Sequence, residues 1–117
     1  MKKRIDAFGY AFAGLYNGIL KESHLRIHFV ALFIVLVLGC YFSITNTEWF
    51  AIFICSGLVI AAELFNTAIE KTCDLITKEK NQAVKYIKDV SAGGVLILAI
   101  ISLIIGCMIF GKRFYHI

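Results

Sequence analysis

Three long apolar segments, residues 27–44, 49–69 and 90–111, constrain the fold of this chain more than any other feature of its sequence. As a helix, each is long enough to cross the hydrocarbon core of a bilayer, which is roughly 30 Å thick. The chain contains no proline that would break such a helix. Hydrophobic residues make up 60% of the 117 residues, more than a soluble domain of this size buries in its own core. We therefore expect an all-α integral membrane protein with three transmembrane helices.

The first 21 residues predict a different kind of helix. Apolar side chains recur there at spacings of three and four, which is typical of a helix with one apolar face: Ile5, Phe8, Phe12, Leu15 and Ile19. Charged residues at both ends and three glycines make the segment too polar to span. We expect residues 1–21 to form an amphipathic helix on the membrane surface. The alternative is an ordinary connecting segment, because glycine weakens a helix.

Together these segments form a single membrane-embedded domain, residues 1–117. The second transmembrane helix is expected to continue beyond residue 69 to about residue 76, and the third to occupy residues 86–111. Five Lys or Arg residues precede the first span, none lies between the first and second, five lie between the second and third, and two follow the third. Because cytoplasmic loops carry the excess of positive charge, we expect a cytoplasmic N-terminus and a C-terminus outside.

An acidic stripe runs along the second of these helices. At ~100° per residue, Glu63, Asn66, Glu70 and Asp74 fall within an arc of roughly 80° on one helix face. Glu63 lies about 10 Å deeper than Glu70 along the helix, so the stripe runs from the hydrocarbon to the cytoplasmic headgroups. Acidic side chains inside a membrane are energetically unfavourable, and they usually mark a functional site.

Other parts of the chain place polar residues at the same membrane boundary. The expected orientation puts Glu22 and Arg26 just before the first span, and Lys88 and Asp89 just before the third. Carboxylates without accompanying His or Cys ligands suit a hard cation, most naturally Mg²⁺, which shares its coordination with water and phosphates. Glu22 and Glu70, near the aqueous side, are the candidates to bind it.

The remaining polar residues suggest complementary roles. Glu63 lies where a carboxylate suits a general base near neutral pH, and Asn66 is placed to orient either Glu63 or a substrate hydroxyl. Lys88 provides a point charge for phosphate oxygens. Structural interpretations stay open for each of these groups. Glu70 and Asp74 would then be solvated interfacial acids, and Lys88 would extend to the headgroups.

The segment AELFNTAIEKTCDLI, residues 62–76, resembles the prokaryotic diacylglycerol kinase family, whose members are small integral-membrane lipid kinases. It is close to the family signature E-x-x-N-[ST]-A-I-E-x-x-x-D. The resemblance is supported downstream by Lys88-Asp89 and the small residues 91–94, and upstream by Glu22 with Arg26-Ile27-His28. It covers nearly the whole chain.

This resemblance implies a homotrimer with active sites at the cytoplasmic interface, shared between subunits, and a reaction that uses ATP with Mg²⁺. Each subunit would have three transmembrane helices and one surface helix. The implied roles are catalytic for Glu63 and Asn66, metal binding for Glu22 and Glu70, lipid binding for Glu63 and Arg26, and ATP binding for Lys3, Tyr10, Glu22, Glu70, Asp74, Lys88 and Asp89. Lys3 stands where the family has an arginine.

We therefore expect an ATP-dependent lipid kinase of the bacterial cytoplasmic (inner) membrane, which transfers the γ-phosphoryl group of Mg-ATP to a lipid hydroxyl. The family includes diacylglycerol kinases and undecaprenol kinases. The Arg26-Ile27-His28 and Thr47-Glu48-Trp49 segments resemble the undecaprenol branch more closely. Two alternatives stay open, a small oligomeric cation or proton channel lined by intramembrane acids and a non-catalytic lipid-binding subunit.

Overall fold

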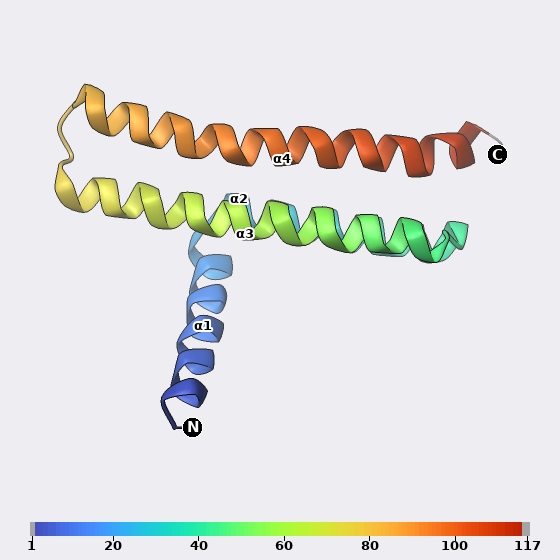
Figure 1. Ribbon diagram of the computed structural model, residues 1–117, viewed down its shortest axis with the longest axis horizontal. Helices are drawn as coiled ribbons and strands as arrows, with labels where there is room; N and C mark the ends of the chain where they lie inside the picture. The colour runs from blue at the N-terminus through green and yellow to red at the C-terminus, as the bar shows by residue number, and fades with distance from the viewer. Residues whose placement is uncertain (1, 116–117) are drawn as a thin grey trace.

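The computed structural model describes residues 2–115 and contains four α-helices in that range: α1 (Lys2–Lys21), α2 (Ser23–Phe42), α3 (Asn46–Ile76) and α4 (Gln82–Tyr115) (Figure 1). Met1, where the expected surface helix begins, and residues 116–117 lie outside the described range. Helices α2, α3 and α4 are each long and apolar enough to cross a membrane. The prediction of an all-α fold with three helices of membrane-spanning character is confirmed.

Helix α3 is central in this arrangement. It packs against α4 on one side and α2 on another, and it runs antiparallel to both because short connections, residues 43–45 and 77–81, join the helices. We call the end of the bundle at residues 43–45 the turn end, and the end at residues 77–81 the loop end. Helix α1 leads away from the bundle at a steep angle (Figure 1), a direction compatible with a helix that lies on a membrane surface.

The long helices extend beyond the apolar segments that predict them. Helix α3 has 31 residues and α4 has 34, so at ~1.5 Å per residue each is about 45–50 Å long, against roughly 30 Å of hydrocarbon. Helix α4 begins at Gln82 rather than near residue 86, and it continues past residue 111 to Tyr115. The flanking residues include Lys, Gln and Ala, which favour helix, so the helix does not end where the apolar run ends.

A tight turn joins α2 to α3. Ser43 ends α2 in the left-handed conformation, with a φ of 51°. Thr45 then begins α3 with a capping box, in which its hydroxyl accepts from the Glu48 N–H at 3.2 Å and the Glu48 carboxylate accepts from the Thr45 N–H at 3.0 Å. A Cβ on Gly39 would lie 2.5 Å from the Trp49 ring. The close approach of α2 and α3 at this end therefore requires glycine at position 39.

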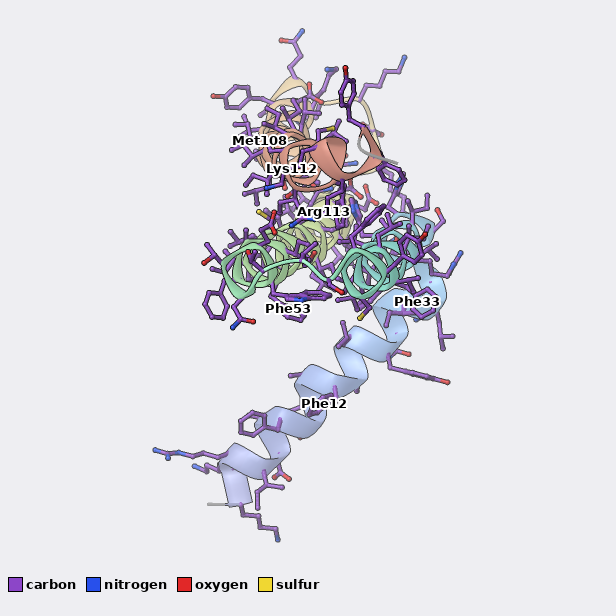
Figure 2. The ribbon with its side chains drawn as sticks, turned by 90° about the vertical axis from the view of Figure 1, so that its right-hand side faces the viewer. Phe12, Phe33, Phe53, Met108, Lys112 and Arg113 are labelled. Carbon is purple, nitrogen blue, oxygen red and sulfur yellow. The ribbon has the colours of Figure 1, made fainter. Side chains whose placement is uncertain are left out.

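The buried core is small and lies near the turn end. Its one cluster consists of Ile44, Ile52, Ile109 and Phe110, while Leu25, Val59 and Cys73 are buried elsewhere along the helices. Many other large apolar side chains face outward, and Phe33 and Phe53 are examples (Figure 2). In water such a surface would drive association, whereas the acyl chains of a bilayer cover it. The small core is what a chain surrounded by lipid requires.

A polar clamp holds α4 to α3 at the turn end. Arg113 donates two hydrogen bonds to the Glu48 carboxylate, from Nη1 to Oε2 at 2.9 Å and from Nη2 to Oε1 at 2.6 Å. Lys112 Nζ is 3.4 Å from Glu48 Oε2, but its side chain is 61% exposed against 19% for Arg113. Bidentate pairing of a guanidinium with a carboxylate is strong, so we expect Arg113 to stabilise the contact more than Lys112.

Replacing Arg113 with alanine is expected to lower the free energy of unfolding by about 1.5–3 kcal/mol, because the partly buried Glu48 carboxylate loses two charged hydrogen bonds. Lys112→Ala is the matched control, with an expected loss under about 1 kcal/mol. Both values are measured by unfolding the purified protein in one detergent. Equal losses in the two variants would contradict the assignment of the clamp to Arg113.

Candidate functional site

Glu63 and Asn66 are the buried polar side chains of α3. Each residue is 7% exposed, and their spacing of three places both on one helix face. A basic side chain of α2 meets this face, because the Nε2 of His28 lies 3.4 Å from the Oε2 of Glu63. The acid expected inside the membrane is therefore buried between helices and paired with an imidazole.

Asn66 has a hydrogen-bond partner on only one side of its amide. Its Nδ2 donates to Glu70 Oε1 at 3.2 Å, which fixes the orientation of the amide. Its Oδ1 is buried and has no hydrogen-bond partner within the described part of the chain. An unpaired buried carbonyl costs about 1–3 kcal/mol, and such a group requires an explanation, of which a bound ligand is one.

The joint between α1 and α2 packs against α3 close to Glu63. Leu25 is 1% exposed, and a Cβ on Gly18 would lie 3.1 Å from Leu25 and 3.5 Å from Leu64. Arg26 anchors the joint, because its Nη1 donates to two carbonyl oxygens in the last turn of α1 at 2.9 and 2.7 Å. Arg26 therefore holds the end of α1 in place, in addition to lying near the expected membrane boundary.

Glu22 lies in the same joint, just before α2 begins. Its Oε1 is 3.4 Å from the Nζ of Lys71, which places it against the part of α3 that carries Glu70. Within residues 2–115, no group of three or more His, Cys, Asp or Glu side chains is arranged to hold a metal ion. Mg²⁺ often uses only one or two carboxylates together with water and phosphates, so this arrangement remains suitable for it.

A polar cavity of about 710 Å³ lies at the loop end, where α3 ends and α4 begins. Asp74, Lys88 and Asp89 all line it. The Nζ of Lys88 donates to Asp74 Oδ1 at 2.8 Å, and Lys85 pairs with Asp89 at 2.5 Å. Four lysines and three acidic residues line the cavity, so its net charge is positive, which favours an anionic ligand.

A second cavity, of about 530 Å³, lies between α2, α3 and α4. Its lining is mostly apolar and runs from His28 and Ile60 toward Ile52 and Phe110 near the turn end. His28 is the one basic residue among those that line it. The two cavities therefore differ in chemistry, one polar at the loop end and one apolar within the bundle.

Lys3 and Tyr10 are not brought to the other predicted residues within one chain. Both are exposed on α1, and Tyr10 is 76% exposed. Helix α1 leads away from the bundle (Figure 1), and no residue of α1 lines the polar cavity at the loop end. The structure of the chain thus unites Glu63, Asn66 and Glu70 on one face and Asp74, Lys88 and Asp89 at one cavity, but leaves the α1 residues separate.

Several contacts that cross between helices were missed by the sequence analysis. These are the His28 contact with Glu63, the Lys71 contact with Glu22, and the anchoring of α1 by Arg26. Helical periodicity indicates which side chains share a face of one helix, but not which other helix lies opposite that face. For the contact of His28 with Glu63, the sequence offered one signal, which is that His28 lies near the start of an otherwise apolar run.

Comparisons with known proteins give matches over most of the chain. The family model of prokaryotic diacylglycerol kinase matches residues 9–110. The undecaprenol kinase of Bacillus subtilis (strain 168) is 38% identical over 110 residues, which cover 94% of this chain and 89% of that protein. The diacylglycerol kinase of Escherichia coli (strain K12) is 28% identical over 110 residues, with 94% and 90% covered. The range matched by the family model contains every predicted site residue except Lys3.

Proposed function

This chain belongs to the prokaryotic diacylglycerol kinase family, and from that premise we propose that it transfers the γ-phosphoryl group of Mg-ATP to the hydroxyl of a membrane lipid, with undecaprenol preferred. The chain is a multi-pass bacterial membrane protein and a phosphotransferase that acts on an alcohol group. The channel and the non-catalytic subunit are set aside, because the relatives that match are kinases.

The observation that carries the proposal is the buried pair of Glu63 and Asn66 on α3. It combines a carboxylate able to accept a proton with an amide oxygen that lacks a partner among the described residues. Both lie on a helix of membrane-spanning character, where the hydroxyl of a lipid would arrive laterally. Glu70 follows on the same face, and the positively charged cavity with Lys88 lies further along, at the end where a soluble nucleotide would enter.

In the proposed reaction the lipid hydroxyl oxygen attacks the γ-phosphorus of ATP, and Glu63 accepts the hydroxyl proton. The bond from the γ-phosphorus to the bridging oxygen breaks, and ADP leaves. Asn66 orients the acceptor hydroxyl through its Oδ1, and its own orientation is held by Glu70. Lys88 places positive charge beside the phosphates, where negative charge must be stabilised in the transition state.

The residues around Glu70 fit a magnesium ion. Glu22 and Glu70 offer carboxylate oxygens, and the amide with the unpartnered Oδ1 is bonded to Glu70. Mg²⁺ prefers such oxygen ligands and keeps several waters when it binds nucleotide phosphates. We assign Glu22 and Glu70 as the residues that would hold Mg²⁺, which would neutralise charge on the phosphates of ATP.

A homotrimer would complete this site. Lys3 and Tyr10, proposed to contact ATP, are exposed on a helix of about 30 Å that leads away from its own bundle. In a trimer that helix would extend toward the nucleotide cavity of a neighbouring subunit.

The lysines at the loop end support a topology in which the N-terminus and this end face the cytoplasm and the C-terminus lies outside. Arg26, at the joint of α1 and α2, is proposed to contact the lipid.

The degree of similarity to named relatives supports undecaprenol over diacylglycerol. The relative named undecaprenol kinase is 38% identical to this chain, whereas the diacylglycerol kinase of Escherichia coli is 28% identical. The apolar cavity between α2, α3 and α4 also begins at His28, beside Glu63. It offers room for part of the hydrocarbon chain of either lipid, with the hydroxyl near that carboxylate, and so supports a lipid acceptor rather than one particular lipid.

The test is an assay of the purified protein with Mg-ATP and a panel of lipid alcohols, in which ADP and phosphorylated lipid are both measured. Undecaprenol is expected to give the highest kcat/KM, diacylglycerol a lower value, and removal of Mg²⁺ by chelation is expected to stop the reaction. Turnover that favours diacylglycerol would overturn the choice of acceptor. ATP consumption that no lipid stimulates would overturn the proposed function.

A further inference from the structure

The His28–Glu63 contact joins two helices at the most buried acid of the chain. His28 belongs to α2 and Glu63 to α3, and their Nε2 and Oε2 atoms are 3.4 Å apart. The Glu63 side chain is 9% exposed and the His28 side chain is 26% exposed. Within the described residues, His28 is the one basic side chain at ion-pair distance from this carboxylate.

Neighbouring polar groups do not provide the same support for Glu63. The side-chain amide donor of Asn66, one turn further along α3, is used by Glu70. Lys71 pairs with Glu22, and Lys88 pairs with Asp74. Among these groups, the side chain of His28 is therefore best placed to orient the Glu63 carboxylate.

The backbone that carries His28 is itself held firmly. Leu25, one turn earlier on α2, is almost completely buried, and it packs against Gly18 at the joint with α1. Arg26 bonds the carbonyl oxygens at the end of α1. These contacts fix the start of α2, and with it the backbone from which the His28 side chain reaches Glu63.

His28 also borders the apolar cavity between α2, α3 and α4, whereas Glu63 is not among the residues that line it. The imidazole therefore lies between the carboxylate and this mostly apolar space. Polar side chains are few among the residues that line this space, so no other side chain on that side can replace the imidazole as the partner of the carboxylate.

We propose that His28 is a positioning residue, which holds the Glu63 carboxylate in the orientation needed to accept the proton of the lipid hydroxyl. This inference rests on the proposed function, because it assumes that Glu63 is the base. Reaction rates are sensitive to misplacement of a catalytic group by as little as ~1 Å. Loss of His28 should therefore slow the chemical step and leave the binding of Mg-ATP, at the other end of the acidic face, unchanged.

The test compares His28→Leu and His28→Gln with the wild-type protein in the lipid kinase assay. His28→Leu is expected to lower kcat by about 10- to 100-fold with an unchanged KM for Mg-ATP. His28→Gln retains an N–H donor and is expected to recover most of that loss. His24→Leu removes an exposed histidine one turn earlier on the same helix and is expected to behave like wild type. If His28→Leu does not fold, His28→Asn takes its place, because its shorter side chain cannot reach Glu63.

Three kinetic results would overturn the proposal: an unchanged kcat in His28→Leu, a loss confined to KM, or a glutamine variant as slow as the leucine variant. A second measurement separates this failure from failure of the proposed function. Thermal unfolding of wild type, His28→Leu, Glu63→Gln and the double variant tests the contact without any turnover. Non-additive stability changes are expected. Additive changes would overturn the role of His28 even in a protein that phosphorylates lipid normally.

Discussion

Replacement of Glu63 by glutamine is expected to lower lipid phosphorylation by about 10²–10⁴-fold, the usual contribution of a positioned general base. Glutamine has nearly the same shape as glutamate and can occupy the same buried position on α3, so we expect the fold to persist. It has no carboxylate to accept the proton of the lipid hydroxyl. The measurement is kcat with saturating lipid and Mg-ATP, together with thermal unfolding of the same preparation.

Glu48→Gln is the control that separates catalysis from stability. Glu48 lies on the same helix, but at the turn end, where it is clamped by Arg113. Its neutralisation is expected to lower the unfolding temperature and to leave the kcat of the folded protein near the wild-type value. Substantial kinase activity in Glu63→Gln would contradict the base assignment. Equal loss of kcat in the two variants would show that the loss reflects folding instead.

Lys88→Ala is expected to reduce kcat/KM for Mg-ATP by about 10²–10³-fold, because it removes a positive charge that we propose stabilises the phosphates. The change also leaves Asp74 without the partner that now lies at 2.8 Å. An unpaired carboxylate would then repel the nucleotide within a cavity whose lining no longer has a net positive charge. The KM for the lipid should stay near its wild-type value, because the lipid is proposed to bind at Glu63.

Lys85→Ala provides a matched comparison within the same cavity. Lys85 is also on α4 and lines the cavity, but it is 77% exposed and pairs with Asp89 along its own helix. Its removal changes the net charge of the lining by the same amount and is expected to affect kcat/KM much less. A similar loss in Lys85→Ala and Lys88→Ala would mean that the cavity acts through its overall charge, and it would contradict a specific role for Lys88.

Much of the candidate site could be predicted because it lies on one continuous helix. Spacing alone placed Glu63, Asn66 and Glu70 on a common face, and in the structure Glu63 and Asn66 are buried while Asn66 bonds Glu70. The ends of α4 were less predictable. Its apolar run ends near residue 111, but helix-favouring polar residues extend it in both directions, from Gln82 to Tyr115.

Helical periodicity in the sequence could not predict the contacts between helices. The pairing of Glu48 with Arg113 joins residues 65 positions apart, and nothing in either local sequence identifies the other. The same holds for His28 with Glu63 and for Lys71 with Glu22. Each depends on how α2 and α4 are rotated about their axes, which is set by packing details such as the contact of Gly39 with Trp49.

The membrane class, the number of membrane-spanning helices and the polar face of α3 follow from the amino-acid pattern alone, because hydrophobicity and helical spacing are local properties of the chain. The folded structure was needed to show that Glu63 contacts an imidazole, that Asp74 and Lys88 pair at the loop end, and that α1 leads away from the bundle. The physical reason is that these features depend on the relative placement of separate helices. That placement follows from side-chain packing between them, not from the pattern within any one of them.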